Sequence, residues 1–202
     1  MITFKKREIV YRPYETVIKT IVDLILIVCA AFLLVTFFFD NTTISGHSMN
    51  NTLENGDVVL INKAAYQFHE PKRYDLVVFE PNIGNVSQYY VKRIIGLPGE
   101  TVQIIDGIIY IDGTPLEDDV IDTVIYNAGN ASEPVKLGYD EYFVLGDNRN
   151  NSDDSRFSNV GLVKRDTIIG TPWLVVYPFS NFGTIKAETL MPEESETGTQ
   201  TQ

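Results

Sequence analysis

Ser48 and Lys92 are the two side chains whose types could together supply a nucleophile and a base. A serine hydroxyl is a weak nucleophile until a neighbouring base takes its proton. Lysine serves as that base in the Ser-Lys variant of nucleophilic catalysis, but only when its amine is neutral. An unperturbed lysine has a pKa of about 10.4, so fewer than about one amine in a thousand is neutral near pH 7. Because burial lowers a lysine pKa, this chemistry requires Lys92 to be desolvated.

Histidine is a more common base, and the chain has only His47 and His69. His47 is the immediate neighbour of Ser48, so in an extended chain the two side chains point to opposite faces. His69 lies in a loop-like stretch just before Pro71. We expect both histidines to be surface residues. With a single cysteine, Cys29, and scattered acids, the sequence also predicts no metal site.

The stretch around Lys92 is typical of a β-strand. Strand alternation places Lys92 on one face with Tyr90 and Ile94, and turns Arg93 to the other face, towards a carboxylate or solvent. An alternative is that Lys92 only protects an edge strand from aggregation. Composition alone favours that alternative, so a catalytic interpretation needs support from other residues.

A second concentration of polar residues spans 146–156, directly after a predicted strand over Tyr142–Leu145. Composition alone predicts a solvated turn here. The acids and arginines of this stretch also suit a hydrogen-bonded scaffold, because paired Arg and carboxylate groups hold a fixed geometry. Both interpretations are open on the residues alone.

An apolar run precedes Ser48 and predicts a transmembrane helix over residues 20–39. Its length is close to the roughly 20 residues that a spanning helix needs. A cleaved signal peptide is the alternative, but its apolar core is usually shorter and ends at small residues, whereas this run ends in Phe37-Phe38-Phe39. Residues 1–19 are then a short cytoplasmic segment, with an interfacial helix around Glu15–Lys19.

The distribution of charge predicts the orientation of this anchor. Residues 1–39 carry five Lys/Arg against three Asp/Glu, and the remainder carries eleven against twenty-four. Since basic residues mark the cytoplasmic end of a membrane helix, we expect the N-terminus in the cytoplasm and the chain after Asp40 outside. The acidic remainder argues against nucleic-acid binding, which requires a basic face.

Beyond Asp40, short β-branched and aromatic runs separated by Gly, Pro, Asn and Asp predict a mainly β domain over 40–187 with antiparallel sheets. Asp106-Gly107 is a strong hairpin signal, because a type I′ turn needs positive φ at both central residues. Residues 114–140 form a loop-rich stretch, and 188–202 a disordered acidic tail. The predicted strands are Asp57–Asn62, Tyr74–Glu80, Gln88–Ile95, Thr101–Ile105, Ile108–Ile111, Tyr142–Leu145, Leu162–Ile169 and Trp173–Tyr177.

Four motifs in this order resemble those of the type I signal peptidases, membrane-anchored serine proteases that remove signal peptides from exported proteins. With the apolar anchor, the resemblance covers nearly the whole chain after the short N-terminus, and it implies the family's antiparallel β catalytic domain. The motifs are Ser45-Gly46-His47-Ser48-Met49, Gly56-Asp57-Val58-Val59, the stretch from Tyr90 to Glu100, and the run from Gly146 to Arg156.

The resemblance implies roles for individual residues. Ser48 is the expected nucleophile and Lys92 the expected general base, in an acyl-enzyme mechanism that requires no cofactor. Ser152 is similar to the family serine that orients the lysine. The expected supporting network is Asp147, Arg149, Asp154 and Arg156.

Two positions depart from the family pattern. Asn51 stands where the family usually has Pro, two residues before Leu53. Gly46 stands where some members have a serine whose hydroxyl helps to hold the oxyanion; the shorter, Gram-positive-like members also have glycine there. The oxyanion hole would then rest on the Ser48 backbone N–H and a second donor, supplied through the geometry at Gly46 or by bound water.

The resemblance also implies the partners. The substrates are exported preproteins with Ala-x-Ala signal peptides, bound in extended form along a strand edge at the outer membrane surface, and the lipid bilayer is the second partner. Shallow substrate pockets are expected from five residues that could equally be ordinary core: Ile44, Met49, Leu53, Tyr90 and Val91.

Two other functions are compatible with parts of the sequence. A non-catalytic relative that acts as an assembly chaperone for surface structures is expected to lose Ser48 or Lys92, and this chain has both. A soluble self-cleaving regulator would use the same dyad, but the apolar anchor and the lack of a DNA-binding segment disfavour it.

Overall fold

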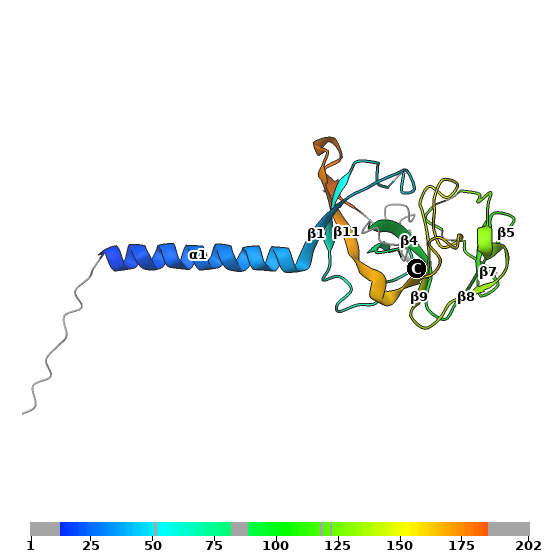
Figure 1. Cartoon of the computed structure of the whole chain (residues 1–202), viewed down its shortest axis with the longest axis horizontal. Coiled ribbons are helices and arrows are strands. Elements are labelled where there is room, and N and C mark those ends of the chain that lie inside the picture. Colours follow the sequence, from blue (N-terminus) through cyan, green and yellow to red (C-terminus); the bar gives the residue numbers. More distant parts are fainter. Residues whose placement is uncertain (1–12, 51, 82–88, 118, 122, 186–202) are drawn as a thin grey trace, which may run out of the picture. The chain divides into compact units, whose positions relative to one another are not determined.

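The computed structural model describes residues 13–50, 52–81, 89–117, 119–121 and 123–185 (Figure 1). Most of the predicted cytoplasmic segment, Asn51, Gln88 and the predicted tail at 188–202 lie outside these residues. The chain divides into two compact units, Met1–Phe38 and Phe39–Gln202. Each unit is described by itself.

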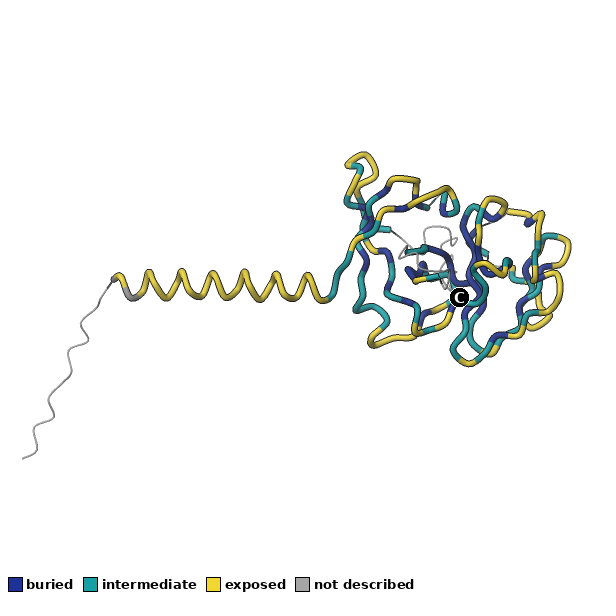
Figure 2. The backbone as a smooth tube through the Cα atoms, in the orientation of Figure 1, coloured by how far each residue is buried: buried dark blue, intermediate teal, exposed yellow. Residues whose placement is uncertain are grey.

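In its described part, the first unit is one α-helix, α1 (Pro13–Phe38). Proline is favoured at the first helical position, where its missing N–H would be unpaired anyway, and no Gly or Pro follows before residue 38. The helix therefore begins earlier than the predicted residue 20 and absorbs the separate helix predicted around Glu15–Lys19. Its segment Thr16–Phe38 is long and apolar enough to cross a membrane, with a mean hydropathy of 2.9 over a window of 18 residues. Residues 16–37 are exposed (Figure 2).

The second unit contains a large antiparallel sheet with the strand order β1-β2-β11-β3-β4-β9-β10, in which β12 also pairs with β11. Figure 1 labels β1, β11, β4 and β9 of this sheet. Neighbours in this order come from distant parts of the sequence, so the sheet brings separate motifs together. Its strands are β1 (Phe39–Thr43), β2 (Val58–Asn62), β3 (Leu76–Phe79), β4 (Tyr90–Gly96), β9 (Glu141–Leu145), β10 (Val163–Lys164), β11 (Ile168–Tyr177) and β12 (Gly183–Thr184).

A smaller antiparallel sheet has the order β7-β6-β5-β8. Its central hairpin turns at Asp106 and Gly107, whose φ values are +50° and +82°, as a type I′ turn requires. This part of the prediction is confirmed. The strands are β5 (Thr101–Ile105), β6 (Ile108–Ile111), β7 (Thr114–Pro115) and β8 (Val135–Lys136).

Apolar side chains pack on both faces of β3, which lies between β11 and β4 in the large sheet. Successive strand residues point to opposite faces, and all four residues of β3 are buried. Leu76 and Val78 pack into one apolar cluster, while Val77 and Phe79 pack into another. Water is therefore excluded from both faces of the sheet at β3.

The predicted mainly β, antiparallel fold is confirmed, with differences at the ends of elements. Phe39 begins β1 rather than ending the apolar helix, and its ring packs on Trp173 at a centroid distance of 5.7 Å. The predicted strand over Leu162–Ile169 is interrupted by a 3-10 turn at Arg165–Thr167. The loop-rich stretch 114–140 contributes β7, β8 and a second 3-10 turn, Gly129–Ser132.

Candidate active site

Ser48 and Lys92 are in direct contact although they are 44 residues apart in the sequence. The distance from Lys92 Nζ to Ser48 Oγ is 2.7 Å, which is a hydrogen bond. Lys92 is only 3% exposed, and its Nζ lies 5.4 Å from the centre of the Tyr90 ring. The contact therefore joins the Ser48 hydroxyl to an amine whose own side chain is largely shielded from water.

Burial lowers the pKa of Lys92 from 10.5 to about 8, against the carboxylates of Asp154, Asp153 and Asp147, which raise it. At a pKa of about 8, about one amine in ten is neutral at pH 7, compared with fewer than one in a thousand for an ordinary lysine. The neutral amine that a base requires is thus present in about a tenth of the molecules at pH 7.

Strand β4 is the element that desolvates Lys92. Lys92 pairs in register with Val77 of β3, which is fully buried. Alternation turns the next residue, Arg93, to the opposite face, where it donates to Asp147. The predicted division of these two cations between the faces of the strand is confirmed.

Ser48 lies at the start of a turn that Gly46 makes possible. Gly46 has a φ of +94°, which an L side chain rarely adopts, and its N–H donates to Asn55 Oδ1 at 2.8 Å. That N–H is therefore engaged in the turn. The Ser48 N–H, by contrast, donates to no described residue, so it is available to a ligand.

The loop 146–156 holds the backbone of this turn. The Asn148 N–H donates to the Ser48 carbonyl at 3.0 Å, and Asn148 Nδ2 donates to the His47 carbonyl at 3.0 Å. A Cβ on Gly146 would lie 2.2 Å from Ser152 Oγ and 2.6 Å from the Ser48 carbonyl oxygen. Only glycine leaves room for the two segments to meet.

Two buried ion pairs fix the loop from inside. Arg93 donates from Nε and Nη2 to the two oxygens of Asp147, at 2.8 and 2.7 Å. Arg156 donates in the same way to Asp154, at 2.8 and 2.9 Å. All four residues are at most 2% exposed. The scaffold interpretation of this loop is confirmed, and the solvated turn is wrong.

A third pair connects the loop to the stretch 114–140, whose role the sequence did not indicate. Arg149 donates from both terminal nitrogens to the carboxylate of Asp119, with Nη2 at 2.7 Å from Oδ1. The Asn150 side chain donates to the Val124 carbonyl and accepts from the Tyr126 N–H, each at 2.9 Å. Part of this stretch therefore anchors the loop from outside.

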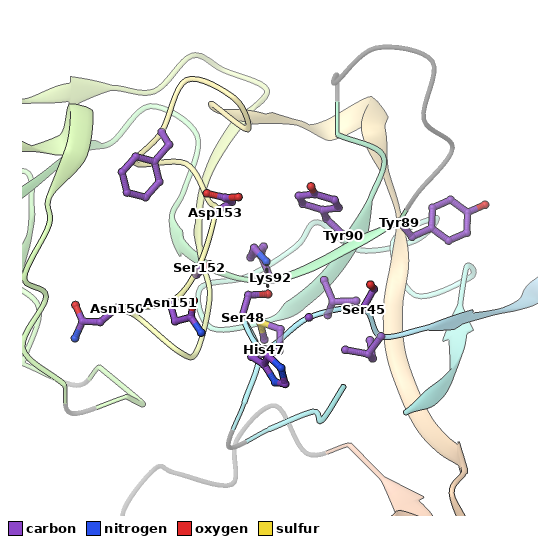
Figure 3. A pocket seen from close by; sticks show the side chains of 15 residues that line it. Ser45, His47, Ser48, Tyr89, Tyr90, Lys92, Asn150, Asn151, Ser152 and Asp153 are labelled. Atoms are coloured by element: carbon purple, nitrogen blue, oxygen red, sulfur yellow. Dashed lines mark hydrogen bonds between the residues drawn. The ribbon is translucent and has the colours of Figure 1, made fainter. Parts of the chain in front are cut away.

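An open pocket of about 430 Å³ lies over the Ser48 and Lys92 side chains (Figure 3). Its walls come from the turn around Ser48, from the start of β4 and from the loop. The lining residues are Ile44, Ser45, Gly46, His47, Ser48, Met49, Tyr89, Tyr90, Val91, Lys92, Asn150, Asn151, Ser152, Asp153 and Phe157.

Four of the five predicted pocket residues line this space, namely Ile44, Met49, Tyr90 and Val91. Leu53 does not: it is 1% exposed and packs in the apolar cluster beneath the turn. Ser152 lines the pocket, but its Oγ is buried without a hydrogen-bond partner among the described residues. The predicted bond from Ser152 to Lys92 is thus not formed in this structure.

Some residues that build the site were not predicted individually. The Thr52 hydroxyl donates to Asp147, and Asn148 and Gly146 hold the Ser48 backbone as described. Both loop residues lie within a motif recognised in the sequence, which is a signal for them. Asp119 has no comparable signal, because an isolated acid in a loop-rich stretch does not reveal its partner.

The chain matches the protein family described as signal peptidase, peptidase S26, over residues 17–177. A signal peptidase I from Leptolyngbya laminosa is 39% identical over 155 residues, which cover 73% of each chain. A probable signal peptidase I-1 from Synechocystis sp. is 34% identical over 187 residues, covering 89% of this chain and 92% of the relative. A crystal structure of a signal peptidase I from Enterococcus faecalis V583 superposes with a TM-score of 0.40 at 33% identity, covering 51% of this chain and 97% of that one.

Proposed function

Since the chain belongs to the signal peptidase family, peptidase S26, and is a serine endopeptidase that cleaves signal peptides, we propose that Ser48 is its nucleophile and Lys92 its general base. The contact of 2.7 Å between Lys92 Nζ and Ser48 Oγ carries this proposal. The lowered pKa of Lys92, about 8, supports it because a neutral amine can accept the hydroxyl proton.

The proposed reaction is acyl transfer in two steps. Neutral Lys92 takes the proton of Ser48 as the hydroxyl oxygen attacks the scissile carbonyl, and the resulting ammonium protonates the leaving amine. Lys92 then takes a proton from water, which attacks the acyl-enzyme and releases Ser48. The Ser48 N–H, which no described residue occupies, would donate to the oxyanion.

Ser152 would support the lysine in this cycle. Its Oγ is buried in the pocket and has no partner among the described residues, so it can accept an N–H from the Lys92 ammonium once that forms. Asp147 and Asp154 would hold the surrounding loop through their arginine partners, and Arg149 through Asp119.

The substrate would bind as an added strand. Residues Tyr90, Val91 and Lys92 pair with β3 on one side, whereas β9 pairs with β4 only from Arg93 onward. Among the described residues, no strand pairs with the other edge of these three residues. This free edge borders the pocket, and a free edge offers backbone groups to an extended peptide. Ile44, Met49 and Val91 line the pocket and would form the apolar wall against the small side chains of an Ala-x-Ala signal.

We also propose that α1 anchors the chain with its N-terminus in the cytoplasm and the domain 40–187 outside. The helix is long enough to span a membrane, and the residues up to 39 carry five Lys/Arg against three Asp/Glu. Protease shaving of intact cells tests this orientation. Digestion of the first nineteen residues with protection of the domain would contradict it.

The dyad is tested by incubating the purified full chain with a preprotein whose signal peptide ends in Ala-x-Ala. Ser48→Ala and Lys92→Ala should each reduce cleavage at least about a hundredfold, the usual contribution of a proton-transferring group. Ser180→Ala and Lys164→Ala, which change exposed residues outside the pocket, are the matched controls and should cleave normally. Undiminished cleavage by either dyad variant would refute the assignment.

A further inference from the structure

The carboxylates of Asp154, Asp153 and Asp147 raise the pKa of Lys92. Only one of them lines the pocket. Asp147 and Asp154 are each at most 1% exposed and each accept two hydrogen bonds from an arginine. Their charges are compensated inside the protein. Neither residue lines the pocket.

Asp153 differs from both. Its side chain is exposed, lines the pocket and makes no hydrogen bond or ion pair with any described residue. Figure 3 shows it on the loop, with Lys92 between it and Tyr90. Lys92 and Asp153 are the only Lys, Arg, Asp or Glu residues among those that line the pocket. When Lys92 is neutral, as the base must be, the Asp153 carboxylate has no opposite charge in the pocket.

We infer that Asp153 is a specificity-determining residue that favours preproteins with a lysine or arginine next to the cleavage site. This inference rests on the proposed function, because it places the scissile bond in this pocket. A basic side chain reaching Asp153 would form a charge-assisted hydrogen bond, whereas an acidic one would be repelled. The rest of the peptide would still bind along the free edge of β4.

The experiment uses preproteins that are identical except at one position, which carries Lys, Gln or Glu. The positions tested are the second before the cleavage site and the first two after it. At one of these positions, we expect the unaltered enzyme to cleave the Lys substrate fastest, the Gln substrate more slowly and the Glu substrate slowest. The preference of Lys over Gln should be about two- to fivefold, the range of an exposed ion pair, and should fall with added salt.

Asp153→Asn should bring this ratio close to one. The ratio of two substrates is the correct readout, because removing a carboxylate near Lys92 also lowers the lysine pKa and changes all rates together. Asp106→Asn is the matched control: it removes the same charge from an exposed hairpin turn outside the pocket, and Asn-Gly suits the same turn type. The control should keep the full preference.

The outcomes separate this inference from the function on which it rests. If the unaltered enzyme cleaves none of the substrates, both fail. If it cleaves the Gln substrate but shows no preference at any position, or if Asp153→Asn keeps the preference, the inference alone is overturned. Equal loss of preference in Asp106→Asn would also overturn it, because the effect would then come from overall charge.

Discussion

The burial of Lys92 should cost the protein stability, and replacing Lys92 with methionine should recover it. Methionine keeps a similar unbranched stem without the charge. Holding the lysine pKa at about 8 instead of 10.5 destabilises the folded state by about 3 kcal/mol at neutral pH, since each pKa unit is worth about 1.4 kcal/mol. This is a sizeable part of the stability of an ordinary domain, which is about 5 to 15 kcal/mol.

The dependence of this cost on pH follows from proton binding. Between pH 8 and 10.5 the unfolded chain keeps a proton on Lys92 that the folded chain has lost, so stability rises with pH through that window. Below pH 8 both states are protonated and the full cost is present. At pH 10 the remaining cost is about 1 kcal/mol.

The assay is urea denaturation of the full chain in a mild detergent, followed by fluorescence. The chain has a single tryptophan, Trp173, which lies on β11 of the large sheet and reports unfolding of the catalytic domain. Relative to the unaltered protein, Lys92→Met should gain up to about 3 kcal/mol at pH 7 and about 1 kcal/mol at pH 10.

Lys164→Met is the matched control, because Lys164 is exposed on β10 and removing a hydrated cation relieves no burial. Its free energy of unfolding should stay close to that of the unaltered protein at both pH values. A gain in Lys92→Met that does not change between pH 7 and pH 10 would refute the reasoning, since it would come from packing rather than from the buried charge.

Three further predictions follow from the same site. The cleavage rate should rise with pH about a midpoint near 8, because Lys92 must be neutral to act as the proposed base. A midpoint near 10 in a pH profile at constant ionic strength would contradict this. Arg93→Met should lower the free energy of unfolding, measured by urea denaturation, by about 3 to 5 kcal/mol, because it leaves the Asp147 charge buried and unpaired. Adding Asp147→Asn should restore much of this loss. If it restores none, the unpaired charge is not the cause. Gly146→Ala should reduce kcat more than it raises KM, because its Cβ would lie 2.2 Å from Ser152 Oγ; unchanged steady-state kinetics would show that the loop can shift freely.

The sequence predicted those parts of the fold in which short-range patterns decide the structure. Thr101–Ile105 and Ile108–Ile111 are strands with the predicted bounds, because the turn residues between them fix the hairpin locally. Alternation around Lys92 and Arg93 also predicted which way each side chain points. The Ser48 and Lys92 roles themselves were expected from a family resemblance, since composition alone favoured an edge-strand lysine.

What the sequence did not predict depends on partners far along the chain. Phe39 ends an apolar run, and only its packing on Trp173 and the pairing of β1 with β2 make it part of a strand. Asp119 reveals its role only through Arg149, 30 residues away. Leu53 is apolar and follows the proposed nucleophile, Ser48, so the sequence could not distinguish a pocket wall from the core beneath it.

The pairing of β4 with β3 makes the enzyme sensitive to the register of β4. Val77 lies opposite Lys92, and Leu76 opposite Arg93. A slip of one residue would exchange the two cations and bring beside Ser48 a guanidinium, which cannot give up its proton in proteins. Such a molecule could keep its sheets and still be unable to begin the reaction. Activity per folded molecule therefore measures the fidelity of folding. Apart from Lys92 and Arg93, β4 should tolerate replacement of a side chain far better than the insertion or deletion of one residue.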